Sequence, residues 1–136
     1  MRIVLDTNSL IQSIPPRSPY RRVWDSIESG ENTLCVTNEI LEEYEEILLR
    51  LTNHSVVVDI MNTIIDSVHV ELVTPYYHFN LITADPDDNK FVDCAIAAGA
   101  RYVVTNDHHY DILQQISFPY VDVISLFDFT SLLNKR

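Results

Sequence analysis

Arg2-Ile3-Val4-Leu5-Asp6 is the stretch that decides the fold, because an apolar run typical of a buried strand leads directly into an acid. A continuous run of this kind is typical of a parallel strand that is covered on both faces. Residues 33–37 and 101–105 repeat the pattern: the first leads into a helix that carries Glu43, and the second leads to Asp107. Functional residues gather at the carboxyl ends of strands in an open parallel sheet. We therefore expect these acids to meet at one edge.

Segments with helical periodicity lie between these strands. Apolar residues recur at helical spacing through residues 38–51 and again through residues 57–68, and residues 89–98 form a further helix that ends at Gly99. Two more strands and three shorter helices are expected at residues 69–73, 120–124, 8–13, 20–29 and after Ser125. Strands that alternate with helices predict an α/β sandwich around a mostly parallel sheet.

Length and composition indicate one folded domain over residues 1–136. A hydrophobic content of 46% and only two glycines argue against disorder. No run approaches the roughly 20 apolar residues of a membrane span, and the start lacks the shape of a signal peptide. We therefore expect a cytoplasmic protein without a membrane partner. Cys35 and Cys94 lie in apolar segments and are expected to be buried thiols rather than a disulfide.

The formal net charge of −11 argues against non-specific nucleic-acid binding, which depends on lysine and arginine. Much of the acidic excess is local, however: part lies on the helix that starts near Asn38, and part lies in the segment 85–88. Bound metal would cancel some of the remaining charge. An acidic surface would also suit a basic partner protein.

Asp6 and Asp107 each have polar neighbours that can orient a carboxylate or hold a water molecule on a metal. These supporting residues are Thr7, Asn8, Thr105 and Asn106. An aspartate can also end a strand for a local reason, by forming an Asx turn with the amides that follow it. The sequence leaves both interpretations of Asp6 open.

Glu43 and Asp93 are acids on or near apolar helix faces. Glu43 lies at the edge of the apolar stripe of its helix, from which it can reach inward. Asp93 is surrounded by apolar residues in segment 91–98, where an unpaired carboxylate costs several kcal/mol, and only Lys90 is near enough to pair locally. A metal ion would resolve this cost, and a helix face exposed through a cleft is the alternative.

Asp88 has two interpretations that the sequence does not separate. It can cap the helix that follows, or it can complete a metal site from the rim. His108 and His109 follow Asp107 directly, but zinc sites collect histidines and cysteines at set spacings that are absent here. Oxygen ligands of this kind select Mg²⁺ or Mn²⁺, as one ion or two. Such ions bind phosphates, which directs the expected chemistry toward hydrolysis of phosphodiesters.

Four segments in order resemble PIN-domain ribonucleases, in particular the branch assigned to toxins of toxin–antitoxin systems. These segments are residues 3–8, 37–44, 85–91 and 100–107. The resemblance implies a three-layer α/β/α sandwich with a five-stranded parallel sheet, and a Mg²⁺ or Mn²⁺ site that cleaves single-stranded RNA. It also implies an antitoxin protein as a partner and, with the two long apolar helices, a homodimer.

The resemblance assigns site residues by position. Asp6, Glu43, Asp93 and Asp107 match the acidic quartet of the family, and Asp88 matches a further acid of this branch. Many relatives have glycine where this chain has Asn106. The larger Asn106 side chain would narrow the approach to Asp107.

Arg17, Arg21 and Arg22 form the one basic cluster that includes aromatic residues, because Tyr20 and Trp24 lie beside them. Arginines hold phosphates and aromatic rings stack on bases, so this cluster is the expected RNA-binding surface. The alternative is a solvated helix start with Trp24 in the core.

Other functions remain as alternatives. The chain could be a PIN-like module that binds a partner protein without catalysis, or a housekeeping nuclease for RNA processing. A haloacid-dehalogenase phosphatase would need a second aspartate where Asn8 stands, and a phospho-receiver domain would need a lysine soon after Thr105. Intact acids argue for the enzyme.

Overall fold

The computed structural model describes residues 1–136 and contains a five-stranded sheet in which all neighbouring strands are parallel. The strands are β1 (Arg2–Leu5), β2 (Thr33–Val36), β3 (Val70–Leu72), β4 (Tyr102–Val104) and β5 (Val123–Ile124). Their order across the sheet is β3-β2-β1-β4-β5, so β1 is central. The predicted α/β fold is confirmed, and the sheet is wholly parallel.

Six α-helices and two 3₁₀ helices connect the strands. They are α1 (Thr7–Ser13), α2 (Arg21–Glu28), α3 (Asn38–Leu51), α4 (His54–Asp66), η1 (Pro86–Asp88), α5 (Asn89–Ala98), η2 (His108–Gln115) and α6 (Leu126–Asn134). Side-chain caps set several helix starts: the oxygens of Thr37, Asn53 and Ser125 accept backbone N–H groups from the first turns of α3, α4 and α6.

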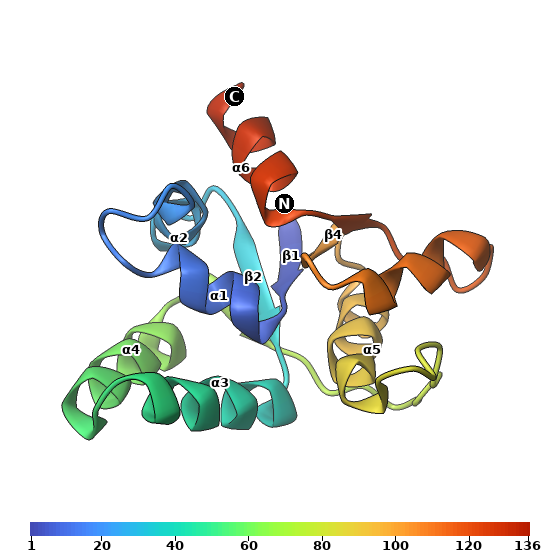
Figure 1. Ribbon diagram of the computed structural model, residues 1–136, viewed down its shortest axis with the longest axis horizontal. Coiled ribbons are helices and arrows are strands. Elements are labelled where there is room, and N and C mark those ends of the chain that lie inside the picture. The colour runs from blue at the N-terminus through green and yellow to red at the C-terminus, as the bar shows by residue number, and fades with distance from the viewer.

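Crossover handedness explains the layers. The chain moves from β1 to β2 and β3 in one direction, and it then returns to place β4 and β5 on the other side of β1. Because such crossovers are right-handed, the crossover helices from β1 to β3 lie on one face of the sheet and α5, in the return crossover to β4, lies on the other. The last helix, α6, packs against α2. Figure 1 shows α1 in front of the strands, and α5 packs against β1, β2 and β4.

The core is one cluster of 29 buried hydrophobic residues. Tyr44 of α3 is fully buried, and its hydroxyl donates to the carbonyl oxygen of Leu5 at 2.6 Å, which ties α3 to the end of β1. Cys35 and Cys94 are buried free thiols, as expected. No helix has both the length and the apolar character needed to cross a bilayer.

The structure differs from the sequence prediction after β4. Residues 108–115 form η2, which the apolar pattern does not predict; its start is fixed by Asp107, whose Oδ1 accepts the N–H of His109 at 2.8 Å. The last strand is only Val123–Ile124, shorter than the predicted segment. The start of η2 brings Asp107 and His109 together at the end of β4.

Candidate metal centre

The site lies where the strand order reverses, between β1 and β4. Leu5 of β1 pairs in register with Val104 of β4, so the two strands end side by side. Connections leave β1 and β4 in opposite directions, which opens a crevice outside their carboxyl ends. Asp6 and Thr105 are the first residues beyond the two strands, and they therefore face one another across this switch point.

Thr105 joins Asp6 to Asp107. The buried hydroxyl of Thr105 donates to Oδ2 of Asp6 and accepts the backbone N–H of Asp107 at 3.0 Å. Oδ1 of Asp6 accepts the N–H of Ser9 at 2.8 Å and so caps α1. The structure thus shows the local capping role of Asp6, and it joins the same carboxylate to Asp107 through Thr105.

Asp6 is held in an environment that disfavours its charge. Asp6 is only 7% exposed to solvent. Burial raises the pKa of the Asp6 carboxyl, and the negative charge of Asp107 raises it further, although hydrogen bonds from Thr105 and Ser9 oppose the shift. A cation at this position would favour the ionised form.

Asp88 lies in the same acidic group. One ligand atom from each of Asp85, Asp88, Asp107 and His109 lies within 4.8 Å of the others. Burial, followed by the charges of Asp85 and Asp107, raises the pKa of Asp88 to about 7. Asp85 caps the 3₁₀ turn that ends at Asp88, with its Oδ1 accepting the N–H of Asp87 at 3.3 Å.

Two buried oxygens in this group lack hydrogen-bond partners. One is Oδ2 of Asp88, and the other is the hydroxyl of Tyr110, a fully buried residue. Burial raises the pKa of the Tyr110 hydroxyl most, followed by the negative charges of Asp88, Asp6 and Asp107, and a weak interaction with the Asp88 carboxyl adds to the shift. Several carboxylate oxygens in one group fit a divalent cation such as Mg²⁺ or Mn²⁺, whereas the imidazole of His109 is a ligand more typical of softer metals.

Glu43 reaches the rim of the site from α3. Its Oε2 accepts the hydroxyl proton of Thr7, the residue after Asp6, and its Oε1 lies 2.8 Å from Nζ of Lys90. Thr7 therefore orients a candidate ligand through its side chain. Lys90 pairs with Glu43, whereas the sequence suggested Asp93 as its local partner.

The structure does not bring Asp93 into this group. Its Oδ1 accepts the backbone N–H of Phe79 at 3.1 Å, and its Oδ2 lies 3.3 Å from Nδ1 of His78. One turn earlier on α5, Asn89 bonds both backbone groups of Ile82. Asp93 is 4% exposed because the segment 74–85 folds over it, and its burial is satisfied by that segment.

Asn8 and Asn106 lie beside the acids without bonding to them. Both line a cavity of about 240 Å³ that also includes Asp6 and Asp107. The Asn106 side chain accepts the N–H of Leu126 at 2.9 Å and so fixes the start of α6.

The predicted basic cluster is largely engaged in internal contacts. Arg21 pairs with Asp25 at 3.1 Å and donates to a backbone carbonyl of the preceding loop. Arg22 pairs with Glu31 at 2.7 Å and reaches the end of α6. Trp24 is 6% exposed and packs in the core, whereas Arg17 is exposed. Arg21 and Arg22 are therefore partly buried and paired at the start of α2, and Arg17 is the exposed member of the cluster.

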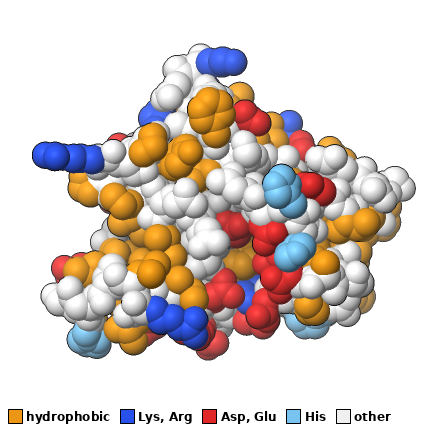
Figure 2. Space-filling view, viewed as in Figure 1, with side chains coloured by type: hydrophobic (Ala, Val, Ile, Leu, Met, Phe, Trp, Pro, Cys, Tyr) orange, Lys and Arg blue, Asp and Glu red, His pale blue; other side chains and the backbone are white.

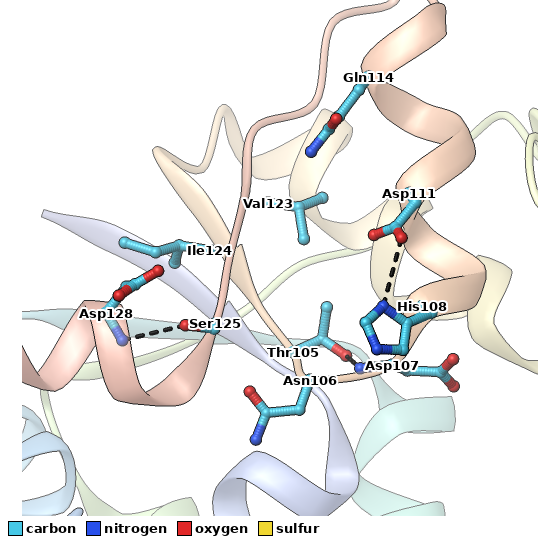
Figure 3. Close-up of a pocket in the computed structure, with 10 residues that line it drawn as sticks. All are labelled: Thr105, Asn106, Asp107, His108, Asp111, Gln114, Val123, Ile124, Ser125 and Asp128. Carbon is cyan, nitrogen blue, oxygen red and sulfur yellow. Dashed lines mark hydrogen bonds and ion pairs between the residues drawn. The ribbon is translucent and has the colours of Figure 1, made fainter.

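The acids form a visible surface feature. Figure 2 shows Asp and Glu side chains gathered in a hollow at the middle of one face, with histidines beside them. Next to Asp107 is a pocket of about 480 Å³ between η2 and the start of α6. Figure 3 shows His108 and Asp111 on the η2 side of this pocket and Ser125 and Asp128 on the α6 side.

Four residues of the site were not assigned to it from the sequence: Asp85, Lys90, His109 and Tyr110. The Asp85-Pro86 pair was a usable signal, since aspartate before proline favours the start of a turn, which Asp85 caps here. The other three depend on the path of η2 and on the approach of α3 to α5, for which the sequence carries no local pattern.

A parallel sheet with acids at its switch point is the architecture of a PIN domain, and the chain belongs to the PIN domain family, which it matches over residues 2–109. It is also similar to the crystal structure of VapBC2 from Rickettsia felis bound to a DNA fragment from their promoter. That similarity has a TM-score of 0.62 with 18% identity, and it covers 92% of this chain and 98% of that chain. At this identity the similarity shows the fold alone. No curated protein matches the chain.

Proposed function

We propose that this PIN-domain protein is a Mg²⁺- or Mn²⁺-dependent endoribonuclease that hydrolyses single-stranded RNA. The observation that carries the proposal is the cluster of Asp85, Asp88 and Asp107 at the switch point, with Asp6 joined to Asp107 through the Thr105 hydroxyl. Like charges at this spacing repel one another, and Oδ2 of Asp88 is buried without a hydrogen bond, with Nδ1 of His109 3.9 Å away. A divalent cation would relieve both costs.

The proposed ligand set comes from four elements. Asp6, Asp88 and Asp107 would hold the ion or ions, Glu43 would contribute from the rim, and His109 adds an imidazole nitrogen 3.2 Å from Oδ1 of Asp107. When bound, the ion activates a water molecule and offsets charge on the phosphate. We place Asp93 outside this set, because its oxygens contact the segment 74–85.

The protein's other groups would position the carboxylates. Thr105 fixes Asp6 and Asp107 relative to each other, and Thr7 orients Glu43. The pocket next to Asp107 supplies amide and hydroxyl groups from Asn106, Gln114 and Ser125. These groups suit hydrogen bonds to a base better than to a phosphate, because acids share the same lining.

Cleavage of RNA oligomers tests the proposal directly. Wild-type protein with Mn²⁺ should cut a single-stranded oligomer internally, and a chelator should stop the reaction. Asp6→Asn should abolish cleavage, whereas Asp59→Asn, which removes the same charge from an exposed position on α4, should leave it intact. Cleavage that persists in the chelator or in Asp6→Asn would refute the proposed chemistry. An inactive wild type that still binds a protein partner would favour the non-catalytic module.

We also propose that an antitoxin protein is a partner. Support comes from the fold shared with VapBC2 and from the resemblance of the four acidic segments to toxins of such pairs. Co-expression with a small protein encoded next to this chain should yield a stable complex in which RNA cleavage is inhibited. A housekeeping nuclease would show neither the complex nor the inhibition.

A homodimer is the proposed assembly. Helices α3 and α4 expose large apolar side chains, namely Leu49, Leu51, Val58 and Ile65. Exposed apolar patches of this kind mark interaction surfaces. Size-exclusion chromatography with light scattering should give twice the chain mass of 15.7 kDa. A monomer at micromolar concentration would contradict the proposal.

A further inference from the structure

Lys90 stands in an unusual position for a lysine. It occupies the first turn of α5, where the positive end of the helix dipole disfavours a cation. Its side chain is nevertheless only 11% exposed, and its Nζ lies 2.8 Å from Oε1 of Glu43 and 5.6 Å from the centre of the Phe91 ring. A lysine held in this place needs negative charge nearby, which Glu43 provides.

The Lys90–Glu43 pair is distinct from the other ion pairs that involve lysine or arginine. The remaining pairs are Arg2–Glu71, Arg21–Asp25, Arg22–Glu31, Arg50–Glu46 and Arg101–Asp122. None of them includes an acid of the candidate metal centre. Among these ion-paired lysines and arginines, Lys90 alone brings a positive charge to the acidic edge.

Both oxygens of Glu43 are already engaged. One accepts the hydroxyl of Thr7, and the other faces the ammonium of Lys90. Two cations close to one carboxylate oxygen repel each other. A divalent ion that uses this oxygen must therefore compete with the lysine.

The ammonium group of Lys90 has a second acidic environment within reach. Lys90 also lines a polar cavity of about 180 Å³, together with the acids Glu39, Asp87 and Asp93. A rotation of the flexible lysine side chain toward these acids would release Glu43 and keep the ammonium close to negative charge. Glu39, Asp87 and Asp93 would pair with the ammonium after this rotation, so the core would hold no unpaired positive charge.

We infer that Lys90 is the resident counter-cation of Glu43, which holds this carboxylate in the metal-free protein and weakens the binding of the divalent ion by competing for it. Lys90 is thus a positioning residue that sets metal affinity. The inference rests on the proposed metal-dependent function.

The test compares Lys90→Met with wild type by calorimetric titration of MnCl₂ and by thermal unfolding in EDTA. Loss of the competitor should tighten Mn²⁺ binding by about fivefold, the factor expected for a partly buried ion pair. Loss of the counter-charge should lower the melting temperature in EDTA by about 3 °C. Arg50→Met is the matched control, because it removes one positive charge paired with a glutamate on the same helix, remote from the site.

The two measurements must move in opposite directions. Weaker or unchanged Mn²⁺ affinity in Lys90→Met, with wild type binding Mn²⁺, would overturn the inference alone. Absence of Mn²⁺ uptake in both proteins would refute the proposed metal site as well. If the Lys90→Met protein fails to fold, Lys90→Gln serves as the second variant, and it should bind Mn²⁺ more tightly in the same way. An equal gain in Arg50→Met would show a general charge effect and would also overturn the inference.

Discussion

Asp88 and Asp93 lie close together in the chain but have different partners in the structure. Asp88 ends η1 among other acids, with a pKa raised to about 7 and one buried oxygen without a partner. Asp93 lies one turn into α5, where a backbone N–H and a histidine satisfy its carboxylate. Both acids are largely shielded from solvent, since the side chain of Asp88 is 16% exposed and Asp93 is 4% exposed. The difference teaches that burial marks an acid for attention, and that only its partners show whether it can bind a cation.

The largest expected effect is a difference in the rate of RNA cleavage between variants of Asp107 and of Asp93. Asp107→Asn should reduce RNA cleavage by at least about 100-fold, since even residues behind metal ligands typically cost 10–100-fold. Asp93→Asn should reduce it far less, because its carboxylate contacts the segment 74–85. Rates on one single-stranded RNA oligomer at saturating Mn²⁺ compare the two variants. Equal losses would remove the distinction between the two regions.

The second effect reverses the order and concerns stability. Asp93→Ala leaves the N–H of Phe79 without an acceptor, and it should lower the free energy of unfolding by about 1–3 kcal/mol. Asp93→Asn keeps an acceptor and should cost less. Urea denaturation measures the difference, and faster proteolysis within residues 74–82 should accompany it. If Asp93→Ala unfolds like wild type, the segment is not held by this contact.

The third effect is a pH dependence that belongs to the acidic edge. The pKa of Asp88 is about 7 in the folded protein, above that of an aspartate in an unfolded chain, so the folded state binds this proton more tightly. Metal-free protein should therefore lose stability as pH rises from about 4 to about 7, and the cost is fully present above that range.

Asp88→Asn provides the control for this pH dependence. It should flatten the slope in melting temperatures measured in EDTA, although the raised pKa of Asp6 leaves a part of it. Mn²⁺ affinity should rise over the same pH range, because the ligand must be ionised. A flat wild-type profile would contradict the electrostatic description of Asp88.

The smallest expected effect concerns the predicted basic cluster. Arg17 is exposed, whereas Arg22 is paired with Glu31. Arg17→Ala should lower the slope of log affinity against log salt for single-stranded RNA by about 0.7 and leave stability unchanged. Arg22→Ala should instead lower the melting temperature. An unchanged salt slope in Arg17→Ala would place RNA elsewhere on the surface.

For acids that directly follow a strand the sequence predicts a shared position, whereas for Asp88 and Asp93, which lie before and within α5, it does not. Asp6 and Asp107 follow from one rule, because parallel strands end at the same edge, and Glu43 follows from its angle on the helical wheel. The choice between Asp88 and Asp93 depends on the path of residues 74–85, which lacks periodicity. That segment returns over α5 and supplies the partners of Asp93. Lys90 could not be assigned because its partner lies on another helix.

The most direct test of the central claim is a calorimetric titration of Mn²⁺ into metal-free wild type, Asp88→Asn and Asp93→Asn at one pH above 7. The claim that Asp6, Asp88 and Asp107 form the cation site predicts binding to wild type and to Asp93→Asn with similar affinity, and little or none to Asp88→Asn. Binding that survives in Asp88→Asn and disappears in Asp93→Asn would contradict it.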